Sequence, residues 1–472
     1  MRKKILLALY FSVMLAPVVN AQEMWGIANS NFAGNMGVEL NPASIAFMPY
    51  DFEINLVSGD IFFQNDYLYM KAGSFPLGRI MKGETKQANW SDHYDAPDKN
   101  AYGNLLIKGP AVVYRNGKVA YGAHMSMRGM FSVRDVNTHL AKFLFEGSDY
   151  SPQWNTDYNT TPYRAAGLAF GEVGITLSQQ VSKSRVAGTS AGITLNYLYG
   201  MDGLYVRSDN MQYSFDDESM FRLNSLDADY GHAVPNDGAA NFMAKRGSGF
   251  STTMGVQYIQ NINPQGYHAG HSENKIRKYL FKAGASIIDL GYINFNRQAK
   301  VYSYSDNSAV WPGFDTTDIN GINHAGEVIS SKIYDNPTQG LTDHHFKTSL
   351  PTAVSGQVDF CVTPVFYANV SAIQPIMQSD KSVRRAKQIS ITPRYETRRF
   401  EAALPVSFYE YKVFRMGAAI RWGMLVLGSD YLSSLFGVTE FNGADFYFGI
   451  KYASDKNGGR RRGGKRQHCP AY

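Results

Sequence analysis

Residues 168–181 read LAFGEVGITLSQQV, and apolar and polar residues alternate along most of this stretch. Successive side chains of a β-strand point to opposite faces. One face would therefore carry Val173, Ile175, Leu177 and Val181, and the other Glu172, Gly174, Thr176, Ser178 and Gln180. Strands of membrane barrels, about ten residues long, turn apolar side chains toward lipid and polar ones inward. The stretch predicts a transmembrane strand.

The same alternation recurs at residues 119–131, 187–199, 354–360 and 399–408. A soluble β-sandwich would also alternate, but its exposed face would be the polar one and its strands would be nearer five or six residues. The pattern therefore favours an all-β fold, a transmembrane antiparallel β-barrel over residues 51–452.

The composition fits an exported barrel. The 472-residue chain is 44% hydrophobic and 14% aromatic, with 31 Tyr and 44 Gly. Residues 1–21 combine basic residues at positions 2–4 with an apolar run and a small residue, Ala21, as a cleavable signal peptide does. The run is too short for an uncleaved anchor to span comfortably. Cys361 and Cys469 are too few for a disulfide framework.

Connection lengths predict the number of strands. Short links at residues 115–118, 182–186, 362–364, 396–398 and 422–423 alternate with long polar links at 72–102, 135–164, 208–246 and 305–345. Bacterial barrels keep short turns in the periplasm and long loops outside. Counting from a first strand at Asp51–Met70 to a last at Asn442–Tyr452 gives about fourteen strands. Sixteen is the alternative, if Gly200–Gly203 splits one strand.

Residues 22–50 are expected to form a short hatch segment inside the barrel, since they are rich in Gly, Asn and small residues. The box Asn41-Pro42-Ala43-Ser44 would carry it, with Asn41 capping backbone groups and Pro42 fixing the turn toward the first strand. If the hatch plugs the lumen, deleting Asn29–Met48 should raise the conductance of the barrel.

This box, with residues 170–174 (FGEVG), 349–351 (SLP), 427–430 (LGSD) and 445–450 (DFYFGI), resembles a Bacteroidota family of outer-membrane proteins of unknown function. It is also similar to the long-chain fatty-acid transporter superfamily, which includes the type IX secretion shuttle barrel. The resemblance spans about 420 residues, from residue 41 to the last strand. It implies an outer-membrane barrel of a Gram-negative bacterium that either passes a hydrophobic ligand or serves secretion or envelope machinery.

Charged residues of both signs are predicted in the lumen. Strand parity turns inward a polar network of Lys108, His124, Arg128, Glu172, Lys282, Asp359, Glu401, Arg415, Arg421 and Lys451. Mixed charges can pair across a narrow interior, so a filled barrel is expected. Because these inward faces are polar and offer no apolar ligand track, the sequence favours a scaffold or accessory component, with transport of hydrophobic molecules as the alternative.

No enzyme, cofactor or metal is expected. His124 and Ser126 share a strand face at the spacing that outer-membrane phospholipases use, but both face inward. Unless Arg128 or another lumen residue serves as an unusual third member, nothing orients the histidine as a triad requires. The pairs His344-His345 and His268 with His271 lie in polar links without matching Cys or carboxylate spacing. Lumen packing and solvated loops are the simpler interpretations.

The C-terminal end carries two signals. Gly443, Phe446 and Phe448 in the last strand resemble the signal read by the barrel-assembly machinery, although an ordinary amphipathic strand could look alike. Residues 453–472 form a basic Gly/Arg tail with Arg460, Arg461, Arg462, Lys465 and Arg466. With an even strand count the tail is periplasmic, where it either docks a secretion-system or other periplasmic protein or is a solvated end. An exported barrel meets no nucleic acid, so the expected partners are outer-membrane lipid and these proteins.

Overall fold

The computed structural model describes residues 24–81, 90–94, 98–184, 186–235, 243–261, 279–317, 321–376 and 379–454. The expected signal peptide, the basic tail from residue 455, Cys469, His268 and His271 lie outside these residues. No helix in the described part of the chain is long and apolar enough to span a membrane.

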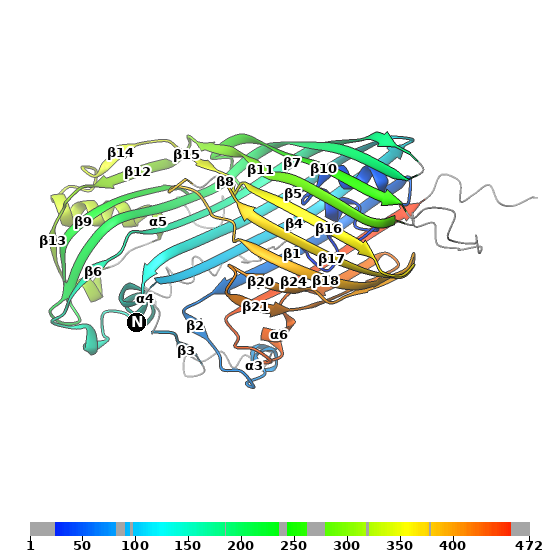
Figure 1. The fold of residues 1–472 in the computed structure, drawn as a ribbon. Coiled ribbons are helices and arrows are strands. Elements are labelled where there is room, and N and C mark those ends of the chain that lie inside the picture. Colours follow the sequence, from blue (N-terminus) through cyan, green and yellow to red (C-terminus); the bar gives the residue numbers. More distant parts are fainter. Residues whose placement is uncertain are drawn as a thin grey trace, which may run out of the picture.

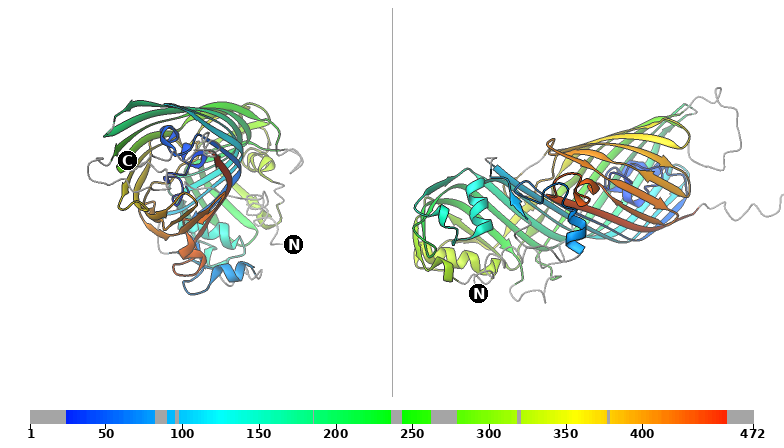
Figure 2. Two further views of the ribbon diagram at one scale, coloured as in Figure 1. Left: turned by 90° about the vertical axis from the view of Figure 1, so that its right-hand side faces the viewer. Right: turned by 90° about the horizontal axis from the view of Figure 1, so that it is seen from below.

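The strands close into a fourteen-stranded antiparallel barrel, as the sequence predicts (Figures 1 and 2). The barrel closes because the first strand pairs on one side with β4 and on the other with the last strand, β24. In order around the barrel the strands are β1 (Phe52–Asn65), β4 (Asp98–Asn116), β5 (Val119–Asn137), β7 (Tyr163–Lys183), β8 (Ala187–Phe215), β10 (Gly247–Asn261), β11 (Tyr279–Phe295), β16 (Ala353–Cys361), β17 (Phe366–Pro375), β18 (Gln388–Glu396), β19 (Phe400–Ala403) with β20 (Val406–Tyr409), β22 (Ala418–Trp422) with β21 (Val413–Met416), β23 (Leu425–Ser429) and β24 (Gly443–Ser454). Gly200–Gly203 lies within β8, so the alternative of sixteen strands is wrong.

The two ends of the barrel differ. All five predicted short links join neighbouring strands at what we call the short-turn end; at the first of them Gly117 adopts φ 62°, a backbone conformation that suits glycine in a tight hairpin. On the outer surface the apolar residues of the alternating strands are exposed, among them Val173, Ile175 and Val181. Their partners in the alternation face inward and are buried, which gives the wall one apolar and one interior face.

At the long-loop end the wall continues beyond the barrel as an extension. The 29 residues of β8 pair with β10 along residues 187–200 and with β9 (Met220–Ala233) along residues 203–215. β9 in turn pairs with β12 (Ala299–Tyr304) and β13 (Ala309–Pro312). The expectation of long polar loops at 208–246 and 305–345 was therefore wrong in part, because strand pairing satisfies much of their backbone.

Short elements complete the long-loop end, where Figure 1 shows α4 and α5 beside the extended strands. They are β6 (Asp157–Thr160), β14 (Leu341–Asp343), β15 (Phe346–Ser349), α4 (Thr138–Glu146), α5 (Ile322–Tyr334), η4 (Ser151–Gln153) and η7 (Phe314–Thr316). Their apolar faces meet in an aromatic cap that includes Phe143 of α4 and Tyr213, Phe215, Phe221 and Trp311 of the wall.

The first strand is shorter than expected, and the wall is interrupted beside it. β1 ends at Asn65, and β2 (Leu68–Tyr69) pairs separately with β3 (Ser91–Asp92), near α3 (Pro76–Met81). β23 spans five residues, and among the described residues β21 has a ladder only with β20. The helix α6 (Leu432–Leu435) fills the interval between β21 and β24. We call this interval the wall break.

Candidate functional site

A plug fills the lumen at the short-turn end, where Figure 2 shows the N-terminal segment enclosed by the strands. Residues 24–50, here called the hatch, contain α2 (Asn35–Val38) and the 3-10 helix η2 (Pro42–Phe47). Asn41 caps η2, since the amide of Ala43 donates to its Oδ1 at 3.0 Å, and Pro42 occupies the first position of the helix. The Asn41 amide also donates to the carbonyl of Val256 at 3.1 Å and to Gln357 Oε1 at 3.2 Å. Ser44 lies half-buried on η2.

Polar side chains of the wall hold the hatch by its backbone. Lys108 Nζ donates to the carbonyl of Asn35 at 2.9 Å, and Lys451 Nζ donates to that of Ala33 at 2.8 Å. Three further wall donors, Ser190, Gln180 and Ser286, reach the carbonyls of Ala43, Ala46 and Leu40. Buried backbone carbonyls need such partners. The inward polar groups of the wall at this level therefore supply hydrogen-bond donors to the backbone carbonyls of the hatch.

Glycines of the wall let the hatch approach closely. A Cβ at Gly192 would lie 2.5 Å from the carbonyl carbon of Pro42, and one at Gly255 would lie 2.2 Å from Asn41 Oδ1. Sequence reasoning did not single out these positions. The available signal was that each falls on the inward face of an alternating strand, where a missing side chain leaves room for a second backbone.

Of the ten residues of the predicted polar network, nine are buried and Lys282 is half-buried. They form separate groups. Asp359 pairs with Arg394 at 2.6 Å and lies 3.4 Å from Lys282, and Glu401 pairs with Arg421 at 3.0 Å. Arg415 is stacked over the ring of Tyr409, 3.7 Å from its centroid, and donates to Gln64 Oε1 at 2.8 Å. Arg394 and Glu53, whose carboxylate accepts from the amide of Asn35 at 2.7 Å, were not among the predicted residues.

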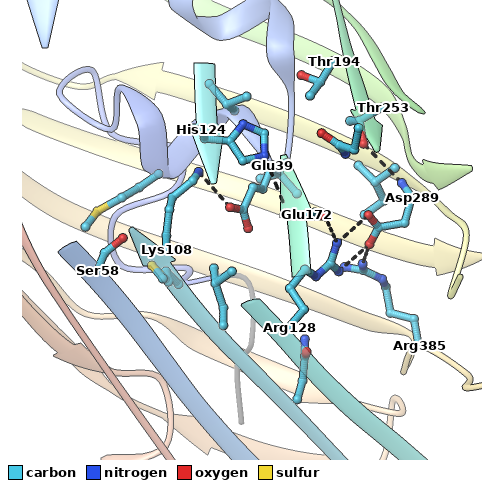
Figure 3. A pocket seen from close by; sticks show the side chains of 18 residues that line it. Glu39, Ser58, Lys108, His124, Arg128, Glu172, Thr194, Thr253, Asp289 and Arg385 are labelled. Carbon is cyan, nitrogen blue, oxygen red and sulfur yellow. Dashed lines mark hydrogen bonds and ion pairs between the residues drawn. The ribbon is translucent and has the colours of Figure 1, made fainter. Parts of the chain in front are cut away.

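Four members, Lys108, His124, Arg128 and Glu172, line a cavity of about 60 Å³ above the hatch (Figure 3). Arg128 of β5 donates to both oxygens of Asp289 on β11, at 2.8 and 2.7 Å. Arg385, from the link between β17 and β18, contacts the same carboxylate. Lys108 pairs with Glu39 of the hatch at 2.8 Å. Sequence reasoning missed Asp289 and Arg385, although Asp289 joins two walls of the barrel.

His124 and Ser126 do not form a catalytic triad. Ser126 Oγ donates directly to Glu172 Oε1 at 2.6 Å, while His124 Nε2 lies 3.7 Å from the same oxygen. In a triad the histidine stands between the hydroxyl and the acid; here the acid stands between the other two. Glu172 is thus the lumen residue beside the histidine, but Ser126 donates to the acid itself and not to a histidine that the acid orients, so the order of a triad is absent.

The link between β17 and β18 folds into the lumen. Residues 379–387, which we call the strap, are held by ion pairs: Arg164 with Asp380 at 3.3 Å, Arg384 with Glu410 at 3.5 Å, and Arg385 with Asp289. The amide of Arg384 also donates to Ser132 Oγ on β5 at 2.9 Å. The strap thus reaches several walls of the barrel through polar contacts.

Above the strap the lumen becomes apolar. The strap residue Val383 packs into a buried cluster with inward-facing wall residues, including Met130, Leu168, Phe170, Leu198, Phe295 and Phe346. The aromatic cap lies beyond this cluster. The expectation that inward faces offer only polar groups was therefore wrong: it holds at the level of the hatch, whereas the strands nearer the long-loop end turn apolar residues inward.

Other predicted residues lie away from this interior. Phe446 and Phe448 are exposed on the outer face of β24, and Gly443 is buried at its start. His345 lies in an exposed link 2.7 Å from Asp343, and no group of three or more potential metal ligands occurs in the described residues.

The model of one protein family matches residues 42–430. The chain belongs to the family of unknown function DUF5723. No match was found among curated proteins. Among solved structures, the chain is similar to the Ralstonia pickettii toluene transporter TbuX, at 8% identity and TM-score 0.43, over 93% of this chain and 99% of that chain. It is also similar to the P. putida toluene transporter TodX, at 9% identity and TM-score 0.40, over 90% of this chain and 95% of that chain. A third similar structure is the translocator domain of the autotransporter NalP from Neisseria meningitidis, at 7% identity and TM-score 0.31, over 85% of this chain and 88% of that chain. The DUF5723 barrel itself is established by the strand ladders of the chain.

Proposed function

We propose that this DUF5723 barrel is an outer-membrane conduit for small hydrophobic molecules, closed in the present state by the strap and the hatch. The supporting observation is the apolar lumen above the strap, where Leu168, Phe170 and Phe295 face inward. A pathway for ions or sugars would need polar groups and water at this level, as the lumen of porins has. The preference for a scaffold rested on polar inward faces, and those faces serve the hatch.

The orientation follows the usual arrangement of bacterial barrels. Short turns lie in the periplasm and long loops outside, so the hatch would close the periplasmic side and the aromatic cap would face the exterior. A hydrophobic molecule entering through the cap would meet the apolar cluster first. The ion pairs of the strap would have to break before it could pass further.

The wall break provides a sideways exit. Among the described residues α6 fills the wall between β21 and β24, with Phe75 next to α3 packed against Phe436. It contacts β21 where the amide of Met416 lies 3.4 Å from Ser433 Oγ. Cysteines at these two positions, in a variant with serine at positions 361 and 469, could be joined by a short reducible cross-linker. Cross-linking should lower uptake of a hydrophobic probe and reduction should restore it; unchanged uptake would place the exit elsewhere.

The main test compares hydrophobic uptake by cells that produce the wild-type protein, a strap variant or no barrel. Asp380→Asn with Arg385→Gln weakens two strap anchors and should increase the uptake rate of a hydrophobic fluorophore such as 1-N-phenylnaphthylamine. Arg222→Gln is the matched control, because Arg222 pairs with Asp216 at 2.6 Å on the exposed edge of the extension. Its uptake should equal that of the wild type. If cells producing the wild-type and strap-variant barrels take up no more probe than cells without the barrel, the transport proposal is wrong.

A further inference from the structure

One cavity of the protein lies outside the apolar lumen. It has a volume of about 260 Å³ and opens at the short-turn end, between the β18–β19 turn, the β22–β23 turn and the end of β24. By comparison, the cavity beside Asp289 holds about 60 Å³. Nothing in the proposed conduit uses this space, because it lies on the opposite side of the hatch from the strap.

The cavity is basic. Arg398, Arg399, Arg421 and Lys451 line it, and Glu53 is the one carboxylate among the described lining residues. The two inner cations, Arg421 and Lys451, are held in place by neighbouring groups. Arg421 donates to the carbonyl of Thr397 at 2.7 Å and stacks 4.4 Å from the ring centroid of Phe32. Lys451 donates to the carbonyl of Ala33. Arg398 and Arg399 stand exposed at the mouth. Arg421 and Lys451 are already paired, with Glu401 at 3.0 Å and with Glu53 at 3.6 Å, so the exposed Arg398 and Arg399 at the mouth are the groups that favour an anion.

The cavity also touches the lipid-facing surface. Met424 and Tyr452 line it and are about half exposed, and the neighbouring Trp422 is 74% exposed on the outer face of the wall. Aromatic residues on the outside of a barrel mark the level of the lipid headgroups. A volume of 260 Å³ is below the ~300 Å³ at which pockets begin to enclose a whole drug-sized ligand, so it suits a headgroup whose acyl chains stay in the bilayer.

We propose that this cavity binds the phosphate headgroup of an anionic phospholipid from the periplasmic leaflet, held by Arg398 and Arg399. Arginine forms strong charge-assisted bonds with phosphate, and basic pockets at a membrane surface hold lipid headgroups. The hatch residues Phe32 and Tyr50 line the same cavity. A bound headgroup would contact the hatch as well as the wall, and the site would exist whether or not the barrel transports anything.

The test measures binding of a water-soluble short-chain phosphatidylglycerol to the purified full-length protein in detergent by calorimetry. The double variant Arg398→Gln with Arg399→Gln should bind at least tenfold more weakly than the wild type. Lys118→Gln is the matched control, because Lys118 is an exposed cation on the β4–β5 turn at the same end of the barrel. Its affinity should stay within twofold of the wild type. Heat-dependent gel mobility shows that each variant is folded.

Two further probes separate the sources of the phosphate group. Inorganic phosphate and short-chain phosphatidylcholine should each bind at least tenfold more weakly than phosphatidylglycerol. If inorganic phosphate bound as tightly as phosphatidylglycerol, the cavity would be a binding site for a free anion, and the assignment to lipid would be overturned. Equal losses in the double variant and in Lys118→Gln, or no loss in the double variant, would show that the cavity is not the site.

Discussion

The carboxylate of Asp289 connects three separate parts of the chain. It accepts from Arg128 across the lumen and from Arg385 of the strap, and its own backbone has φ 55°, a left-handed conformation that aspartate tolerates better than most residues. Its carbonyl accepts from Thr352 Oγ1 at 2.9 Å, next to the interruption between β15 and β16. A single residue therefore fixes both the shape of the wall and the position of the strap.

Replacing Asp289 with Asn should destabilise the barrel strongly. The change leaves Arg128 and Arg385 without the carboxylate that they share, and removing one partner of a buried ion pair costs about 3–5 kcal/mol. Asp216→Asn removes a partner from the exposed pair with Arg222, which should cost less than ~1 kcal/mol. Urea unfolding followed by gel mobility measures both. Equal effects of the two substitutions would mean that water reaches Asp289 freely.

A second residue-scale prediction concerns Gly192. Alanine there should push against the backbone of Pro42 and Ala43, and overpacking of this kind costs about 1–3 kcal/mol. Gly356→Ala on β16 is the control, because nothing lies within 4 Å of a Cβ at that position. The unfolding midpoint and protease sensitivity of the hatch report the outcome. A hatch that is unchanged by Gly192→Ala but loosened by Gly356→Ala would refute the proposed close packing.

At this scale, strand parity predicted which residues face inward because the two-residue period is a local property of the chain. Lys108, Glu172 and Asp359 could be assigned from a few neighbours each. Their partners could not, since the register across a barrel depends on all of the intervening strands. The strap residue Arg385 lies in a polar stretch, residues 379–387, that reads as a solvated link, and only the three-dimensional closure of the wall turns it inward.

Among the elements, the hatch and the strap are two obstructions at different heights in one lumen. The wall holds the hatch through carbonyl groups, as at Asn35 and Ala33, whereas the strap depends on side-chain ion pairs. When the strap pairs break, the half-exposed Asp380 can be solvated and Asp289 keeps its bonds to Arg128. Removing the hatch leaves wall groups such as Lys108 without their backbone partners. The strap is therefore the easier of the two to move.

Obstructions in series make a prediction for planar-bilayer conductance. Deleting Asn29–Met48 should raise the conductance only slightly, because the strap and apolar cluster still resist the current. Replacing residues 379–386 with a short Gly/Ser link should also have a small effect alone, and combining both changes should raise the conductance by more than the sum of the two. A full increase from the hatch deletion alone would show that the strap does not obstruct the lumen.

The element boundaries show where sequence reasoning reached its limit. Turn chemistry such as Asn116-Gly117 marks a short link locally, so all five short links were found. β9 and β13 were taken as loops because they lie in the extension beyond the barrel, where the outer face of a strand need not be apolar and the alternation disappears. The wall break was also not visible, since α6 is only four residues long.

For the whole molecule, the closing ladder predicts that the tail is dispensable for folding. β1 pairs with β24 up to Phe52 with Ser454, so a chain cut after Ser454 keeps its complete closing seam. The truncated protein should fractionate with the outer membrane and keep heat-modifiable mobility.

If Arg460 and its basic neighbours dock a periplasmic partner, the cut should release it, and salt should weaken the association because exposed charges are screened beyond ~8 Å at physiological ionic strength. If the partners stay bound after both the truncation and the increase in salt, the tail is a solvated end.

The length of β8 determines how far the wall extends beyond the barrel. Its 29 residues span about 95 Å at ~3.3 Å per residue, and a tilt of ~45° leaves roughly 67 Å along the membrane normal, against an apolar band of ~25 Å. With the short turns in the periplasm, the tip of the hairpin between β8 and β9 would clear the bilayer by roughly 40 Å. Antibodies or phage directed at residues 209–222 should therefore recognise intact cells even where surface polysaccharide hides the flanking loops, and flow cytometry can measure that recognition.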